Sequence, residues 1–133
     1  MILEVAVLDV KPGNEAAFER DFETASAFIS GVDGYVSHEL QRCVEKKNRY
    51  ILLVRWKTIE AHTEGFRKSP QYAEWKKLLH HYYDPFPAVE HYSAVVARRW
   101  NPTSGRVGSG GDSSNPPGGR VSPAARVATR RRA

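Results

Sequence analysis

The order of strand-like and helix-like segments is the feature that most limits what this chain can fold into. Four segments have the composition of strands: residues 1–10, 35–43, 49–56 and 89–96. The first and the third are rich in Val, Ile and Leu on both faces, which is typical of strands in the middle of a sheet. The second mixes polar and apolar residues on each face and predicts a less buried strand.

A helix is predicted between the first two strands, because apolar residues recur there at helical spacing. These residues are Phe18, Phe22, Ala25 and Ile29. Asn14 precedes them, and its side-chain oxygen can accept the unpaired amide protons of a first helical turn. Gly31 follows them and is expected to end the helix.

A second helical region is predicted between the third and fourth strands. Residues 59–68 form a short helix, and Ser69 and Pro70 then restart the helix as its cap and first residue. The apolar stripe of this second part consists of Trp75, Leu78, Leu79 and Tyr82.

The resulting order, β-α-β-β-α-β, predicts an α+β fold of the ferredoxin-like type, with an antiparallel sheet and both helices on one face. The other face of the sheet would then be bare, although two of its strands are apolar on both sides. A bare apolar face of this size exceeds what a monomer usually exposes. We therefore expect a homodimer in which two copies pack sheet to sheet. The alternative, coverage within one chain, would need structure in the C-terminal tail.

The uneven distribution of charge along the chain predicts a folded domain, residues 1–97, followed by a tail, residues 98–133. The tail holds eight arginines against one acidic residue, so residues 1–97 carry a net charge of −2 although the whole chain carries +5. The tail is rich in Arg, Gly, Pro and Ser, and from residue 101 onward it has no aromatic residue, which predicts disorder. Nucleic acid is therefore an expected partner only through the basic tail, if at all.

The composition also limits the compartment. A single cysteine, Cys43, excludes an internal disulfide and a cysteine-based zinc cluster. The N-terminal run contains Glu4 and Asp9 and lacks a basic start, so it is not typical of a signal peptide. No uncharged apolar stretch approaches the roughly 18 residues of a membrane helix. A soluble, cytoplasmic protein without membrane contact is expected.

Residues 1–97 resemble the antibiotic biosynthesis monooxygenase (ABM) family. The likeness rests on the element order, on an apolar first strand that ends in Lys-Pro-Gly at residues 11–13, and on residues 49–92. In that block a strand ending in Trp56 is followed by a helix, a Ser-Pro restart and a closing strand with His91. The resemblance implies a dimeric α+β barrel in which each subunit has a pocket between its sheet and its helices.

The resemblance also bears on activity, because members of this family differ. Some oxygenate polycyclic aromatic substrates without a metal or prosthetic group, some degrade haem, and others handle quinones or small signalling molecules. The haem degraders use an Asn, a Trp and a His, and the matching positions here hold Ala6, Gly65 and Glu74. Haem degradation is therefore not expected, above all because the axial histidine is missing.

Cofactor-free oxygenation needs a base that forms the substrate anion and donors that stabilise the developing charge. Helical phase places Tyr72, Tyr83 and His81 at the borders of the apolar stripe, whereas His80 points to solvent. Tyr72, Tyr83 and His81 are therefore the predicted catalytic residues. The predicted substrate contacts are His38, Trp56, His62, Phe66, Trp75, Phe86 and His91.

The predicted function is a cofactor-independent monooxygenase that acts on a small aromatic or quinol-like substrate. No metal and no cofactor are expected, since neither a local ligand motif nor a phosphate-binding loop is present. Two alternatives stay open: a non-catalytic small-molecule-binding or stress-response barrel, and a structural dimer whose basic tail recruits an acidic partner.

Overall fold

The computed structural model describes residues 1–103, and residues 1–95 form one compact unit. The predicted boundary at residue 97 stays a prediction. The predicted tail lies outside the described residues from residue 104 onward, so its disorder stays a prediction as well.

The sheet has four antiparallel strands in the order β2-β3-β1-β4. Their bounds are β1 Ile2–Asp9, β2 Tyr35–Arg42, β3 Arg49–Trp56 and β4 Val89–Tyr92. The prediction of β4 over residues 89–96 is wrong in length. β4 pairs only with β1, and Tyr92 already lies opposite Leu3, so the chain passes the end of its partner strand at that point.

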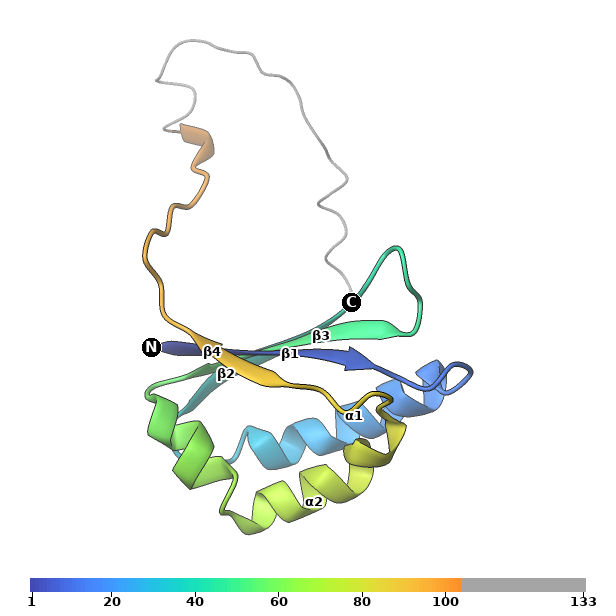
Figure 1. Cartoon of the computed structure of the whole chain (residues 1–133). Helices are drawn as coiled ribbons and strands as arrows, with labels where there is room; N and C mark the ends of the chain where they lie inside the picture. The colour runs from blue at the N-terminus through green and yellow to red at the C-terminus, as the bar shows by residue number, and fades with distance from the viewer. Residues whose placement is uncertain (104–133) are drawn as a thin grey trace. The chain divides into compact units, whose positions relative to one another are not determined.

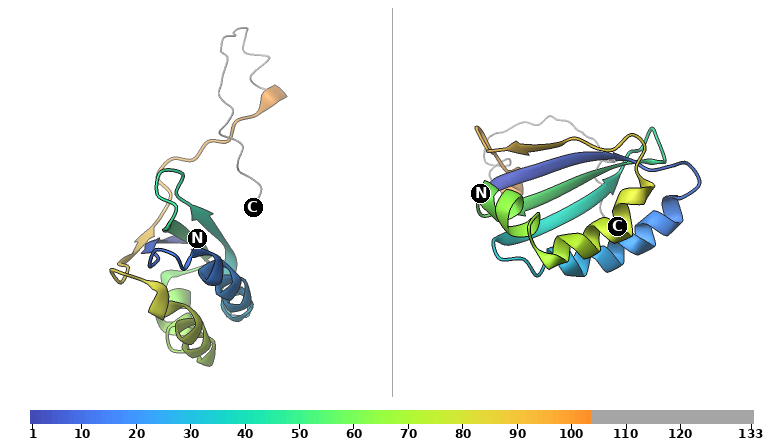
Figure 2. Two further views of the ribbon diagram at one scale, coloured as in Figure 1. Left: turned by 90° about the vertical axis from the view of Figure 1, so that its right-hand side faces the viewer. Right: turned by 60° about the horizontal axis from the view of Figure 1, so that its bottom comes forward.

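Both long helices cover one face of the sheet, as Figure 1 and the right-hand view of Figure 2 show. They are α1 (Glu15–Ile29) and α2 (Pro70–Leu79), accompanied by the short helical segments η1 (Ala61–Phe66) and η2 (His80–Tyr82). The element order and the one-sided helices confirm the predicted ferredoxin-like α+β fold.

The two long helices begin differently. Ser69 caps α2 as predicted: its Oγ accepts the Tyr72 backbone N–H at 3.2 Å, and Pro70 is the first helical residue. The predicted cap by the Asn14 side chain is wrong, because its Nδ2 donates to the Lys11 carbonyl at 3.3 Å. The Asn14 backbone carbonyl instead accepts the first helical N–H, that of Phe18.

The core lies between the helices and the inner face of the sheet. Phe18, in the first turn of α1, is fully buried and lies 4.9 Å from the Tyr50 ring of β3, measured between ring centroids. Trp56, the last residue of β3, is also fully buried. The predicted apolar stripe of α1 is confirmed, since all four of its members are buried. Large-to-small substitutions at such sites cost about 3–5 kcal/mol.

The other face of the sheet carries apolar side chains that α1 and α2 leave uncovered, since both helices lie on the opposite face (Figure 1). On β1 and β3, Val5 pairs with Leu53 and Val7 pairs with Ile51, and the side chains of these pairs alternate with the buried ones. Val7 is 44% exposed, and the other three are half-buried. We call these four residues the open sheet face.

Candidate functional site

A chain of polar side chains lies on the helix-facing side of the sheet, next to the first residues of β1. Glu4 of β1 is buried, and its Oε1 accepts the indole N–H of Trp56 at 2.9 Å. The same oxygen lies 3.5 Å from Nε2 of His62, which belongs to η1. The other ring nitrogen of His62, Nδ1, lies 2.8 Å from Nε2 of His91 on β4. We call Glu4, His62 and His91 the relay cluster.

Strand register brings the two ends of the relay cluster together. Glu4 and His91 are direct partners in the β1–β4 ladder, so their side chains lie on the same face of the sheet. β4 is an edge strand, and His91 is accordingly half-buried, whereas the His62 side chain is only 3% exposed. The cluster therefore runs from a buried carboxyl group to an imidazole at the border of the core.

Close packing of η1 places His62 between them. The His62 ring stacks on the Trp56 indole, with centroids 5.4 Å apart and an interplanar angle of 20°. Gly34, just before β2, permits this approach, because a Cβ at Gly34 would lie 2.5 Å from the Cβ of Ala61, the first residue of η1. The φ of Gly34 is +89°, a conformation that favours glycine.

Burial sets the protonation of this cluster. It raises the pKa of Glu4 above its ordinary value, against the opposing effects of the Trp56 hydrogen bond and the positive charge of Arg67. Burial lowers the pKa of His62 to about 3, and Arg67 and His91 add to that shift. Burial also lowers the pKa of His91, again with help from Arg67. Both imidazoles are therefore neutral at pH 7.

The contact between His62 and Glu4 then favours one tautomer when Glu4 is ionised. A carboxylate only accepts, so His62 carries its proton on Nε2, toward Glu4. Its Nδ1 is then an acceptor and takes the Nε2–H of His91. No hydrogen bond within residues 1–103 involves Nδ1 of His91, which in this tautomer holds a free lone pair.

Aromatic rings extend from the relay cluster along η1 and α2. His62 lies 6.2 Å from Phe66, Phe66 lies 5.1 Å from Tyr72, and Tyr72 lies 5.9 Å from His80, all between ring centroids. His80 in turn lies 4.9 Å from Phe86. This series of rings joins the imidazoles of the relay cluster to the loop between η2 and β4.

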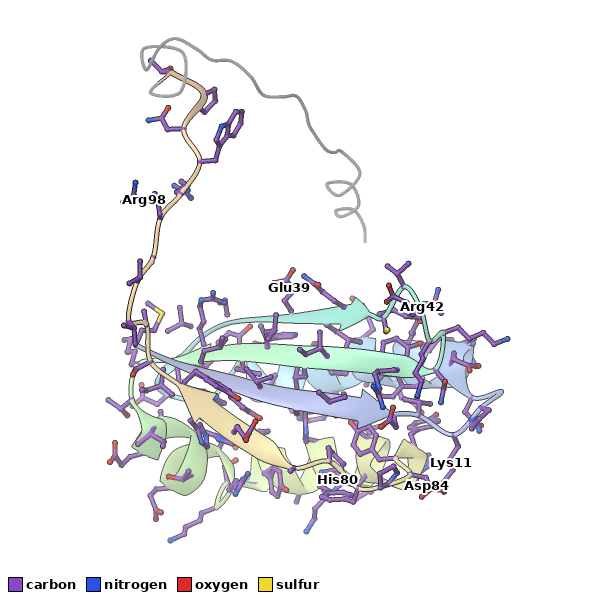
Figure 3. The ribbon with its side chains drawn as sticks, turned by 45° about the horizontal axis from the view of Figure 1, so that its top comes forward. Lys11, Glu39, Arg42, His80, Asp84 and Arg98 are labelled. Carbon is purple, nitrogen blue, oxygen red and sulfur yellow. The ribbon has the colours of Figure 1, made fainter. Side chains whose placement is uncertain are left out.

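The predicted orientations of His80 and His81 are reversed in the structure. α2 ends at Leu79, and the tighter turn of η2 then rotates the residues that follow. His80 is half-buried among the rings of Tyr72, Tyr83 and Phe86. His81 is exposed, and its Nε2 lies 3.1 Å from the Leu78 carbonyl. Figure 3 shows His80 at the same end of the domain as Lys11 and Asp84.

The two predicted catalytic tyrosines both lie in this aromatic region. Tyr72 and Tyr83 are half-buried, and Tyr83 contacts the rings of Phe18, His80 and Phe86. Burial, with a smaller effect of Tyr72, strongly raises the pKa of the Tyr83 hydroxyl, which therefore stays protonated and can donate a hydrogen bond.

The remaining predicted substrate contacts fall into two groups. The first group belongs to the relay cluster or contacts it directly and consists of Trp56, His62, Phe66 and His91. Trp75 packs in the core against Phe22 and Phe66, and Phe86 is 62% exposed.

His38 lies outside the relay cluster and is fully paired. Its Nε2 lies 2.9 Å from Oγ of Ser26, which donates to the Phe22 carbonyl, and its Nδ1 lies 2.5 Å from the Tyr35 hydroxyl. Burial lowers its pKa. With both nitrogens occupied, His38 ties β2 to α1.

Glu4 is a site residue that was not predicted from the sequence. The signal was available, because Glu4 alternates with Ala6 and Leu8 on the inward face of β1, and a charged residue in such a position is rarely buried without a partner. Its partners could not be identified, because Trp56 is 52 residues away in the sequence.

The part of the chain that the structure describes contains neither a metal-binding cluster nor a membrane-spanning helix. Within residues 1–103, no group of three or more His, Cys, Asp or Glu side chains is arranged to hold a metal ion. No helix in the same residues combines the length and the apolar composition needed to cross a membrane.

Fold and site together define a small α+β domain with a buried carboxyl–imidazole chain between an antiparallel sheet and its helices. Residues 1–78 match the family model of the antibiotic biosynthesis monooxygenases. This chain belongs to the antibiotic biosynthesis monooxygenase family, which confirms the resemblance seen in the sequence.

Individual proteins are similar to this chain over most of their length. The Bacillus subtilis (strain 168) protein YczJ is 52% identical over 95 residues, which are 71% of this chain and all of that protein. A Bordetella bronchiseptica structure that carries the family name is 35% identical with a TM-score of 0.69, covering 71% of this chain and 97% of that one. SnoaB, a cofactor-independent oxygenase from Streptomyces nogalater, is 26% identical with a TM-score of 0.56, covering 76% and 96%.

Proposed function

We propose that this protein is a cofactor-independent monooxygenase that acts on a small aromatic or quinol-like substrate, with His91 as the base. The observation that carries the proposal is the geometry of His91. This half-buried imidazole has one ring nitrogen held by a buried histidine, and its other nitrogen has no hydrogen bond within residues 1–103. The likeness to a cofactor-independent oxygenase supports the type of reaction.

The chemistry needs only a base and a protected substrate anion. An anthrone, for example, loses a proton to become an electron-rich anion that reacts with dioxygen. One oxygen atom becomes the new carbonyl, and the other leaves as water with the two hydrogens of the substrate's methylene group. The substrate supplies the electrons, so a base of suitable pKa is the main requirement. Because burial lowers its pKa, His91 is neutral and able to accept a proton at pH 7.

The aromatic series would hold the substrate. Tyr72, His80 and Phe86 offer ring faces and edges to a flat substrate, and buried Phe66 packs against Tyr72. The Tyr83 hydroxyl is a donor for a developing oxyanion. Tyr72 and Tyr83 stay in the proposal from the sequence prediction. His81 does not, because it is exposed and its ring is directed at the last turn of α2.

A homodimer completes the proposal. The open sheet face is apolar and lies on the side of the sheet away from α1 and α2 (Figure 1), and a second copy packed against it would remove its side chains from water. The wall of the site would then be stiffened by a second sheet, which helps to keep water from a reactive anion.

Oxygen consumption tests the proposal. Wild-type protein is incubated with a panel of anthrones and hydroquinones, and dioxygen uptake is followed together with product mass. We expect turnover by the wild type, loss of at least about a hundredfold in kcat for His91→Gln, and unchanged turnover for the matched control His81→Gln. Tight binding of a panel member with no chemical change would instead support the non-catalytic small-molecule-binding alternative. The absence of any uptake above buffer would contradict the proposed reaction.

A further inference from the structure

We infer that the relay cluster carries the substrate proton from His91 through His62 to Glu4, so that the buried carboxyl group is the final proton acceptor. This inference rests on the proposed function, because it assigns the proton that His91 removes. It makes Glu4 and His62 residues that act through His91, without touching the substrate themselves.

The geometry provides a continuous path. Nε2 of His91 lies 2.8 Å from Nδ1 of His62, and Nε2 of His62 lies 3.5 Å from Oε1 of Glu4. The second distance is long for a hydrogen bond, but contacts of this kind often tighten only when substrate binds. The indole N–H of Trp56, at 2.9 Å, holds the same carboxyl oxygen in place.

Proton movement along this path is balanced. The substrate gives its proton to Nδ1 of His91, and His91 passes its Nε2 proton to Nδ1 of His62. His62 then passes its own Nε2 proton to Oε1 of Glu4. Both imidazoles end neutral with the proton on the opposite nitrogen, and the negative charge moves from Glu4 to the substrate. The protons return by the same path when the oxygenated intermediate takes one back.

Burial explains why the proton would not stop on an imidazole. The His62 and Glu4 side chains are 3% and 7% exposed, and a buried charged group without a partner is costly. An imidazolium at His62 would also face the positive charge of Arg67, which lowers the pKa of both histidines. Protonation of Glu4 instead removes a buried negative charge, in agreement with its raised pKa. Among residues 1–103, the charged or titratable groups that face Glu4 are His62, His91 and Arg67.

A pH titration followed by NMR tests the relay without a substrate. The carboxyl carbon of Glu4 and the ring nitrogens of His62 and His91 are followed in labelled wild-type protein from pH 8 to pH 4. We expect all of them to change at one midpoint above 4.5, with both rings exchanging Nε2–H for Nδ1–H and neither becoming an imidazolium there. If Glu4 titrates while the rings keep their tautomer, or if His62 becomes an imidazolium at that midpoint, the relay is wrong.

Variants extend the test to activity. Glu4→Gln keeps acceptors for Trp56 and His62 but cannot take a proton, so the tautomer exchange should vanish. Its kcat should fall by about a hundredfold with little change in KM. The matched control is Glu45→Gln, which removes an exposed carboxylate in the turn between β2 and β3. Because the NMR titration uses the wild type, the relay can be tested even if Glu4→Gln does not fold.

The outcomes separate the relay from the proposed function. A wild type that turns over substrate and a Glu4→Gln variant with equal kcat would overturn the relay and leave the oxygenase standing. Coupled tautomer exchange in a protein that oxygenates no panel member would support the relay as a proton-linked unit and contradict the reaction.

Discussion

Replacement of His62 by Gln should make the stability of the protein less dependent on pH. The folded state buries the His62 imidazole and lowers its pKa to about 3, whereas the unfolded chain has the ordinary value near 6.5. A group with a lowered pKa binds more protons in the unfolded state between those two values. His62 therefore contributes stability that is present above pH 6.5 and is lost as the pH falls toward 3.

The size of the effect follows from one proton. Each pH unit within that window changes the free energy of unfolding by about 1.4 kcal/mol for one group. Between pH 6 and pH 4, His62 should therefore remove about 2–3 kcal/mol from the stability of the wild type. The His62→Gln variant should lose less stability than the wild type over the same interval, and the difference should equal that amount. The reason is that the amide side chain does not titrate.

Urea unfolding followed by tryptophan fluorescence measures this difference at pH 7, 6, 5 and 4, at one fixed protein concentration. Glu4 acts in the opposite direction, because its raised pKa makes the folded state bind more protons than the unfolded state above pH 4.5. The comparison is therefore repeated between Glu4→Gln and the double variant Glu4→Gln, His62→Gln. His81→Gln, which removes an exposed histidine, is the control. The opposite result is a free energy of unfolding that changes equally with pH whether or not His62 is replaced by Gln, both in the wild type and in the Glu4→Gln background. That result would refute a buried, neutral His62.

Three further substitutions test the packing around the site and the proposed homodimer. Gly34→Ala should destabilise the domain by at least about 1 kcal/mol more than Gly13→Ala in urea unfolding. Both positions have positive φ, but only a Cβ at residue 34 would meet η1. Equal losses of stability would contradict the close approach of η1. Trp56→Phe should cost about 2 kcal/mol because buried Glu4 loses its indole donor, and it should raise the midpoint of the Glu4 titration in NMR; an unchanged midpoint would argue against that hydrogen bond. Val7→Glu should weaken self-association at least about tenfold in sedimentation equilibrium by placing a charge on the open sheet face, whereas a wild type that sediments as a monomer at micromolar concentration would contradict the proposed homodimer.

The sequence was sufficient to predict the framework of the fold. Strand-like composition located all four strands, and the helical spacing of Phe18 and its neighbours located α1, because binary pattern and local propensity agree there. Ser69 and Pro70 marked the start of α2 through local chemistry that needs no tertiary partner. The predicted length of β4 was too great, because the length of an edge strand depends on where its partner strand ends.

The arrangement of the site was harder to predict, since it depends on contacts that are distant in the sequence. The reversal of His80 and His81 comes from a change of helical pitch after Leu79, and a pattern read at one fixed period cannot include such a change. His62 and His91 were named as candidates, but nothing in the sequence indicated that they share a hydrogen bond or that Glu4 lies beneath them.

Mapping of a bound ligand by NMR tests the central claim most directly, namely that the chemistry of this protein takes place beside His91 between the sheet and its helices. An unreactive anthraquinone is titrated into labelled protein in the absence of a reducing agent, and the perturbed signals are assigned. We predict that the largest changes fall on His91, Phe66, Tyr72 and His80. Changes confined to His81 or to the open sheet face, with His91 unaffected at saturation, would contradict the account.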